Sequence, residues 1–285
     1  MKFGKTIKVF LIDGEPNGRM TCELSNWTGK AYKIPRTQLK ICTDRPELNN
    51  TGVYMLFGKV PDDSTKSLVY IGEAEGMYAR LVSHLNTKDF WNEAVVFVRK
   101  DENLKKAHIK YLESRLYEFA VHTKRFHLEN SNIPTRSSIS EADQAEMEEF
   151  LANITILVNI LGYKVFDELR EPHTPEREAQ QTFSIIATRG ANGNGLPTSD
   201  GFVVLAGSQI ANPVTKTCPK GMAKLRETLL NEAAIQEQDG KYLLTEDYLF
   251  SSSSAAAMMV MGRNANGLTE WKLTDKTTLK EFEIK

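Results

Sequence analysis

The chain has 285 residues, of which 41% are hydrophobic and 26% are charged, and its formal net charge is −1. The length predicts two domains, and the composition is ordinary for a soluble globular protein. A net charge this close to zero gives no reason to expect that the chain as a whole binds a polyanion.

The cysteine pattern argues against a disulfide framework and against a zinc site. Cys22, Cys42 and Cys218 are far apart, odd in number and form no C-x-x-C pair. The amino terminus holds only a short apolar run, ended by Asp13, which is too short for a signal-peptide core or a membrane span. We therefore expect a soluble, cytoplasmic protein with no membrane partner.

Residues 1–50 predict a small β-ribbon. Strands are expected over 7–12, 19–24 and 31–34, and a short helix over 36–42. The segment has nine Lys and Arg residues against five Asp and Glu, a net charge of +4, so it offers either a basic surface or an ordinary solvated face. As nucleic-acid contacts on such a surface we select four cations, namely Arg19, Lys30, Lys33 and Arg36.

The next segment predicts a hairpin, a helix and a third strand. The strands over 51–60 and 68–73 are rich in β-branched and aromatic residues, and Pro61–Ser64 between them has turn chemistry. A helix with a buried apolar stripe is expected over 76–85, and a strand over 93–99. This order predicts a small antiparallel sheet flanked by helices.

Two longer helices are predicted after this sheet. The first spans 101–123 and has a regular apolar stripe. The second spans 140–161, with Ser140 as its N-cap and Gly162 as its stop signal. The polar stretch 124–139 between them is expected to be a loop.

The last part of the chain predicts a separate α+β domain. A polar segment with two prolines precedes it and is interpreted as a linker. Short elements then alternate: strands over 183–188 and 202–206, helices over 221–234 and 251–262, extended segments over 242–244 and 248–250, and a turn at 264–267 before a strand at Trp271. The predicted boundaries are 1–50 for the ribbon, 51–165 for the central domain with its following helix, 166–180 for the linker, and 181–285 for the carboxy-terminal domain.

Five side chains of the central domain form a set suited to phosphodiester cleavage. Tyr54 and Tyr70 lie on paired strands, so both hydroxyls can point to one place. Arg80 and His84 are four residues apart and share one helical face. Glu113 borders an apolar stripe, where a carboxylate is costly to desolvate unless something pairs with it. Together they offer a proton acceptor, a cation for the phosphate and a ligand for a divalent metal.

Each of these residues also has an ordinary structural explanation. A tyrosine in a strand is usually a packing residue, and an arginine and a histidine at this spacing are usually a solvated face. Glu113 can instead form a salt bridge with Arg115 or Lys110. Taken one at a time, none of the five indicates a function.

The order and spacing of the five residues together resemble the GIY-YIG nuclease family. Gly52-Val53-Tyr54 matches the first family motif, and Tyr70-Ile71-Gly72 matches the second. The pair Arg80 and His84 matches the helix that follows, and Leu112-Glu113 matches the helix that carries the metal-binding glutamate of the family.

The resemblance covers roughly residues 51–133 and has one departure. The family places an asparagine after the second helix, and Asn130 is the better match, with Asn132 close behind. The separation of Tyr54 and Tyr70 is longer than is usual for the family. An insertion in the Pro61–Lys66 loop would explain this without moving the tyrosines.

The resemblance implies a fold and an activity. The fold is α+β, with a small mixed or antiparallel three-stranded GIY-YIG-type sheet flanked by helices, preceded by the β-ribbon and followed by a separate α+β domain. The activity is that of a metal-dependent endonuclease that hydrolyses phosphodiester bonds in DNA. The ribbon looks like the extension that precedes this nuclease domain in some bacterial proteins.

The resemblance also implies roles for the matched residues. Tyr54 would accept a proton from the attacking water or hold that water, and His84 would take the proton onward. Arg80 would hold the phosphate with its planar donors, and Tyr70 would hydrogen-bond the phosphate or the water. A Mg²⁺ ion, or Mn²⁺ in its place, would bind Glu113. Asn130 completes the implied catalytic set.

Residues 183–280 resemble a small domain of unassigned function that is often joined to such nucleases. Its first signature matches Gly201–Leu205 with Gly207-Ser208. Its second signature, which is also similar to modules attached to restriction and DNA-modification enzymes, matches Phe250–Ser253, Ala255–Ala257, Gly262–Asn264, Asn266-Gly267 and Trp271-Lys272. The serines at 251–254 either bind an anion at a helix start or simply cap that helix. A DNA-targeting role for the domain is an analogy at the level of fold.

Two other functions remain open at this point. The first is a non-catalytic nucleic-acid-binding or regulatory protein built on a nuclease-like fold. The second is a scaffold for protein interactions. Metal-dependent nicking of DNA separates the nuclease from both.

Overall fold

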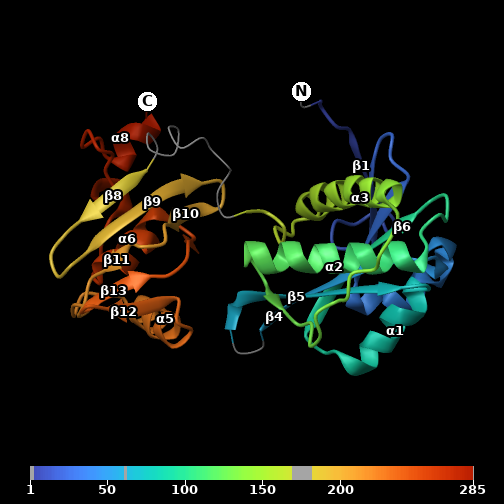
Figure 1. Ribbon diagram of the computed structural model, residues 1–285, viewed down its shortest axis with the longest axis horizontal. Helices are drawn as coiled ribbons and strands as arrows, with labels where there is room; N and C mark the ends of the chain where they lie inside the picture. Colours follow the sequence, from blue (N-terminus) through green and yellow to red (C-terminus); the bar gives the residue numbers. More distant parts are fainter. Residues whose placement is uncertain (1–2, 61–62, 169–181, 285) are drawn as a thin grey trace. The chain divides into compact units, whose positions relative to one another are not determined.

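A computed structural model describes residues 3–60, 63–168 and 182–284 of the chain. These residues fall into two compact units, Met1–Glu168 and Leu169–Lys285 (Figure 1). Each unit is a mixed α+β structure with its own sheet and hydrophobic core, in agreement with the predicted class. The predicted linker at 166–180 lies for the most part outside the described residues.

The first unit is built on a seven-stranded mixed sheet. Its strand order is β1-β2-β3-β6-β4-β5-β7. The short strand β7 pairs with β5 in parallel, and the other neighbouring strands pair antiparallel. The strands are β1 (Ile7–Leu11), β2 (Met20–Leu24), β3 (Gly29–Pro35), β4 (Gly52–Val60), β5 (Asp63–Ala74), β6 (Trp91–Arg99) and β7 (His127–Leu128).

The ribbon expected to precede the three-stranded sheet is continuous with it. Strand β3 pairs with β6 along its whole length, from Gly29 opposite Arg99 to Pro35 opposite Glu93. Strand β6 pairs in turn with β4 on its other side. Local alternation predicts that these strands exist, but it does not say which of them are neighbours, because either edge of a strand offers the same backbone donors and acceptors. The same limit explains why β7 was expected to be loop.

Helices cover both faces of this sheet. Helices α2 and α3 lie side by side on one face, and α1 lies on the other with two short 3-10 helices (Figure 1). Because strand side chains alternate between faces, Tyr54 belongs to the α1 core and Met55 to the α2 core. The bounds are η1 (Arg36–Asp44), η2 (Pro46–Asn49), α1 (Met77–Thr87), α2 (Lys106–Thr123) and α3 (Glu141–Ile160).

The second unit has an antiparallel sheet in the order β12-β13-β11-β9-β10-β14, with β8 paired to β9. Residues 192–198, between the strands expected over 183–188 and 202–206, form a further strand, β9, and the helix expected to reach residue 234 ends at Asn231. The elements are β8 (Phe183–Ile186), β9 (Asn192–Thr198), β10 (Gly201–Val204), β11 (Gln209–Ile210), α5 (Lys220–Asn231), β12 (Ile235–Gln238), β13 (Lys241–Leu244), β14 (Tyr248–Phe250), α6 (Ser253–Met261), α7 (Gly267–Glu270) and α8 (Leu279–Ile284).

Helix α6 is the central helix of the second unit. It is apolar on all sides, and Ala256, Ala257, Met259 and Val260 are fully buried. An all-round apolar helix is stable in water only when neighbours cover it, and here α5, α7 and several strands pack around it. Within the ranges that the structure describes, no helix is both long and apolar enough to cross a bilayer.

Candidate active site

The two tyrosines of the motifs lie next to each other on one face of the β4–β5 hairpin. Tyr54 is opposite Gly72 and Tyr70 is opposite Leu56, so both side chains point toward α1. Their ring centroids are 6.1 Å apart. A Cβ atom on Gly72 would lie 2.5 Å from ring atoms of Tyr54, so the glycine of the second motif provides the space for this ring.

Helix α1 brings Arg80 and His84 to the Tyr54 hydroxyl. Tyr54 Oη is 2.7 Å from His84 Nε2, and Arg80 Nε donates to Tyr54 Oη at 3.2 Å. Tyr54 is fully buried and His84 is 4% exposed, whereas Arg80 is exposed. The hydroxyl therefore connects a buried imidazole to a cation at the surface.

The surroundings of His84 indicate which of its nitrogens carries the proton. Thr87 Oγ1 donates to the Ser83 carbonyl at 3.1 Å, so it is left to accept from His84 Nδ1, 3.4 Å away. Burial, helped by the charges of two nearby cations, lowers the pKa of His84 to about 4. A neutral ring protonated on Nδ1 leaves Nε2 free to accept the proton of the Tyr54 hydroxyl.

The hydroxyl of Tyr54 is itself far from ionisation. Burial and the neighbouring Tyr70 raise the pKa of Tyr54 well above its ordinary value, and the opposing effect of Arg80 is smaller. At neutral pH the residue is a phenol that donates to His84. It can accept a proton from another molecule only while it passes its own proton to His84.

Glu113 lies on α2 and therefore on the other side of the sheet from α1. It is half-buried. Burial and the charge of Glu73 raise the pKa of Glu113 to about 7, while Arg80 and Lys110 act in the opposite direction. The carboxylate is thus within electrostatic reach of Arg80, although it does not share a sheet face with the two phenols.

The alternative salt bridge between Glu113 and Arg115 does not form. Arg115 donates instead to Glu148, at 2.7 Å, and to Glu118, at 2.9 Å. These pairs connect α2 to α3 and leave Glu113 facing Glu73. The structural explanation that involved Arg115 is therefore wrong.

The pair Glu73 and Glu113 suits a hard divalent cation. A carboxylate whose pKa is raised by burial and by a second carboxylate gains from a nearby positive charge, and Mg²⁺ characteristically takes one or two carboxylates and keeps several waters. Across residues 3–60, 63–168 and 182–284 there is no group of three or more His, Cys, Asp or Glu residues arranged to hold a metal. The available donors fit Mg²⁺ with a largely aqueous shell.

Asn130 has both atoms of its amide engaged with the backbone of β5. The Ile71 amide donates to Asn130 Oδ1 at 3.0 Å, and Asn130 Nδ2 donates to the Ile71 carbonyl at 2.7 Å. The side chain thereby continues the pairing of β7 with β5 and holds the strand that carries Tyr70. Asn132 is exposed. The observed role of Asn130 is to position a strand.

The four cations selected as nucleic-acid contacts all have partners inside the first unit. Arg19 is 6% exposed, and the lysines form ion pairs at 3.0 Å. A phosphate would have to displace a carboxylate or a carbonyl to reach any of them. The partners are Asp13 and Asp44 for Arg19, Glu47 for Lys30, Glu93 for Lys33, and the carbonyls of Leu85 and Lys88 for Arg36.

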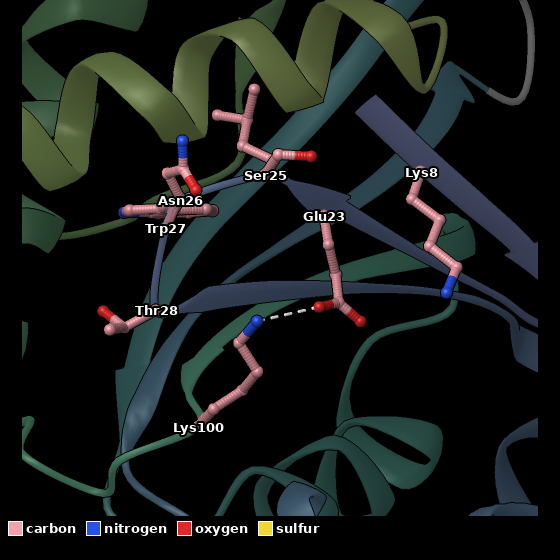
Figure 2. A pocket seen from close by; sticks show the side chains of 8 residues that line it. Lys8, Glu23, Ser25, Asn26, Trp27, Thr28 and Lys100 are labelled. Atoms are coloured by element: carbon pink, nitrogen blue, oxygen red, sulfur yellow. Dashed lines mark hydrogen bonds and ion pairs between the residues drawn. The ribbon is translucent and has the colours of Figure 1, made fainter. Parts of the chain in front are cut away.

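A hollow of about 450 Å³ lies beside the turn that carries Trp27. Figure 2 shows Glu23 and Lys100 pointing toward one another there, and their charged atoms are 2.9 Å apart. Trp27 packs on Gly29, where a Cβ atom would lie 2.2 Å from the ring, and its ring centroid is 4.8 Å from that of Phe150. The tryptophan therefore packs against the core, and the hollow is lined by an internally paired glutamate and lysine.

The serines of the second unit are explained by local structure. The Ala255 amide donates to Ser252 Oγ at 3.2 Å, which is an N-cap bond. The Gly267 amide donates to Ser254 Oγ at 3.0 Å and ties α7 to α6. The capping explanation accounts for Ser252, and Ser254 instead joins two helices.

Lys88 lies near the phenols and was not predicted from the sequence as a site residue. Lys88 Nζ lies 4.1 Å from the centroid of the Tyr70 ring. Arg80, His84 and Lys88 follow one another at intervals of four residues. That regular spacing is a signal that could have identified Lys88, because residues four apart lie on one helical face.

Comparison with known protein families identifies the second unit only. The family model described as "Domain of unknown function (DUF4357)" matches residues 183–283. This confirms that the carboxy-terminal part is a domain of unassigned function. No curated protein and no solved structure matches the chain. The comparisons give no GIY-YIG family match for the amino-terminal region, so that resemblance stays a prediction.

Proposed function

We propose that the first unit is a metal-dependent endonuclease of the GIY-YIG type that hydrolyses phosphodiester bonds in DNA. The observation that carries the proposal is the Tyr54 hydroxyl, held 2.7 Å from the neutral ring of His84 and 3.2 Å from the guanidinium of Arg80. A hydroxyl placed between a proton acceptor and a cation is suited to move a proton beside a phosphate.

In this proposal the protein groups act as a relay. A water molecule attacks the phosphorus atom and gives its proton to Tyr54 Oη as the Tyr54 proton moves to His84 Nε2. Arg80 holds the phosphate and stabilises the charge that develops on it. A Mg²⁺ or Mn²⁺ ion bound by Glu113, with Glu73 beside it, would supply further charge neutralisation and assist the leaving oxygen. Tyr70 hydrogen-bonds the phosphate or the water.

The second unit and the location of the protein complete the proposal. By analogy of fold, the domain at 181–285 selects or tethers the DNA target. The three cysteines are free, which suits a reducing compartment such as the cytoplasm. This part of the proposal is tested by the retention of duplex DNA by the intact chain with and without substitutions in the second unit.

A non-catalytic nucleic-acid-binding role is the second candidate. The observation that favours it is the placement of Glu113 on the opposite sheet face from the phenols, together with the raised pKa of Tyr54. Both features would suit a protein that holds a phosphate without cleaving it.

Nicking of supercoiled plasmid in Mg²⁺, Mn²⁺ or EDTA separates the two candidates. We expect nicking with either metal and none in EDTA. Glu113→Gln should abolish nicking and remain folded, whereas Glu118→Gln on the same helix should nick normally. Full activity of Glu113→Gln in Mg²⁺ would contradict the nuclease assignment, and DNA binding without nicking by the wild-type protein would select the second candidate.

A further inference from the structure

Two cations near the phenols differ from three of the four cations selected above as nucleic-acid contacts. Arg19, Lys30 and Lys33 each form an ion pair with a carboxylate. Among the residues that the structure describes, Arg80 and Lys88 have no such pair: Arg80 donates to Tyr54 Oη, and Lys88 lies over the Tyr70 ring. Two cations that form no ion pair with a carboxylate therefore lie where the two tyrosines meet.

The backbone of Lys88 is held in a defined place. Lys88 follows the last turn of α1, and its amide donates to the His84 carbonyl at 3.1 Å. Arg36 Nη1 donates to the Lys88 carbonyl at 2.7 Å, and Arg36 Nη2 donates to the Leu85 carbonyl at 2.9 Å. These are carbonyls that a helix end leaves without intrahelical donors. The turn is therefore anchored by a side chain from η1.

Arg36 is fixed in turn by a buried aromatic ring. Its guanidinium lies 4.5 Å from the centroid of Trp91, which is fully buried on β6. Trp91 Nε1 also points to the His84 carbonyl, at 3.5 Å. Arg36 and Trp91 together connect the rigid sheet to the turn that presents Lys88, so the ammonium group is directed at Tyr70 by packed structure.

The charges around the phenols favour the binding of an anion. His84 is neutral, since burial and the charges of Arg80 and Lys88 lower its pKa to about 4. The Tyr54 hydroxyl is an uncharged donor, and the cations of the cluster are Arg80 and Lys88. A phosphodiester is an anion with several acceptor oxygens, and it would be met by Arg80 on one side and by Lys88 on the Tyr70 side.

We propose that Lys88 is a second phosphate-binding cation of the candidate site, acting beside Tyr70, and that Arg36 is the positioning residue that holds it there. This inference rests on the proposed function for its substrate, a DNA phosphodiester. It also changes the role predicted for Arg36, which serves the phosphate through the α1 turn and does not touch it.

Binding of a labelled DNA duplex in EDTA tests the role of Lys88 without any need for cleavage. Each phosphate contact by a lysine adds about one to the slope of log affinity against log salt. We expect Lys88→Gln to reduce that slope by about 1 and to weaken binding about tenfold at low salt, with Lys88→Arg close to wild type. Lys8→Gln, an exposed lysine on the opposite edge strand of the sheet, is the matched control and should leave both quantities unchanged.

Arg36 is tested by a double-mutant cycle. If Arg36 acts through Lys88, Arg36→Gln weakens DNA binding in the wild-type background and has no further effect on affinity in the Lys88→Gln background. A merely structural role would weaken binding equally in both backgrounds, and that result would overturn the positioning role.

The binding and nicking assays fail in distinguishable ways. A wild-type protein that binds but does not nick, with the slope reduced in Lys88→Gln, would refute the nuclease and support the phosphate site. Equal slopes for Lys88→Gln, Lys8→Gln and the wild type would overturn the inference even if the protein nicks DNA. A wild-type protein that neither binds nor nicks would overturn both.

Discussion

The two units use arginine at helix ends in the same way but differ in the polar groups around their motifs. In the first unit Arg36 donates to carbonyls at the end of α1, and in the second unit Arg226 donates to the Met259 carbonyl of α6 at 2.6 Å and to the Ala211 carbonyl. Both guanidiniums thereby donate to carbonyls at a helix end that lack an intrahelical donor. The difference lies in what surrounds them.

The motif serines and Trp271 of the second unit bind backbone, whereas Tyr54, Arg80 and His84 of the first unit bind each other. Ser252 and Ser254 accept backbone amides, and Trp271 donates to the Ser253 carbonyl. Tyr54, by contrast, shares its hydroxyl with two side chains. A side chain that satisfies backbone cannot change partner without loss of structure, whereas side chains that meet near the surface can take a ligand between them. This difference locates the candidate chemistry in the first unit.

Of the substitutions that test this comparison, Tyr54→Phe should have the largest effect on plasmid nicking. Tyr54→Phe keeps the ring in its cavity and removes the relay, so we expect plasmid nicking to fall by about 10²- to 10⁴-fold. DNA binding in EDTA should persist. Tyr78→Phe, on the first turn of α1, is the matched control and should nick normally. Wild-type nicking by Tyr54→Phe would show that the hydroxyl has no chemical role.

Two glycine substitutions, one in each unit, should lower stability alike but differ in their effect on nicking. Gly72→Ala forces a Cβ atom against Tyr54, and Gly267→Ala forces one against Ser253 backbone atoms 2.2 Å away, so each should cost about 1–3 kcal/mol or more in urea unfolding. Only Gly72→Ala should also reduce the nicking rate per folded molecule, because it displaces the phenol. Gly76→Ala, whose Cβ atom would be 3.7 Å from its nearest neighbour, is the control. An equal reduction of the nicking rate in Gly72→Ala and Gly267→Ala would contradict the assignment of the chemistry to the first unit.

A smaller effect is expected on the pH dependence of stability in Glu113→Gln. The pKa of Glu113 is raised to about 7 in the folded protein, so the folded state keeps a proton that the unfolded state has lost, and the wild type loses stability as pH rises from about 4.5 to about 7. Glu113→Gln removes this loss. Since the group is only half-buried, we expect a gain on the order of 1 kcal/mol above pH 7, about 2–4 °C in Tm, and little difference at pH 4.5.

Thermal unfolding in EDTA at these two pH values measures the difference. A Glu113→Gln variant that is less stable than the wild type at pH 8 would mean that the carboxylate is favourably paired in the folded protein. That outcome would remove the electrostatic reason to place a cation there.

The smallest effect is expected at the α6 cap. Ser252→Ala should cost about 1 kcal/mol through loss of the N-cap bond and should leave DNA retention by the intact chain unchanged. Ser252→Asn, which keeps a capping oxygen, should restore stability. Weaker DNA retention by Ser252→Ala at wild-type stability would mean that the serine binds an anion, and the contrast between the units would then be less sharp.

Much of the candidate site could be predicted from periodicity and spacing. The hairpin pattern places Tyr54 and Tyr70 on one face, and the interval of four residues places Arg80 and His84 on one side of α1. The first relation is between the paired strands of one hairpin and the second is between residues along one helix, so local backbone geometry determines both. Capping of α3 by Ser140 was predictable for the same reason.

Partner choice across the sheet was not predictable from local pattern. Pairing of β3 with β6, the anchoring of the α1 turn by Arg36, and the approach of Glu73 to Glu113 all join segments far apart in the chain. Each depends on which exposed edges and charges meet once the layers have packed, and many alternatives have similar local energies. Only the tertiary structure selects among them, since it alone removes water from both partners at once.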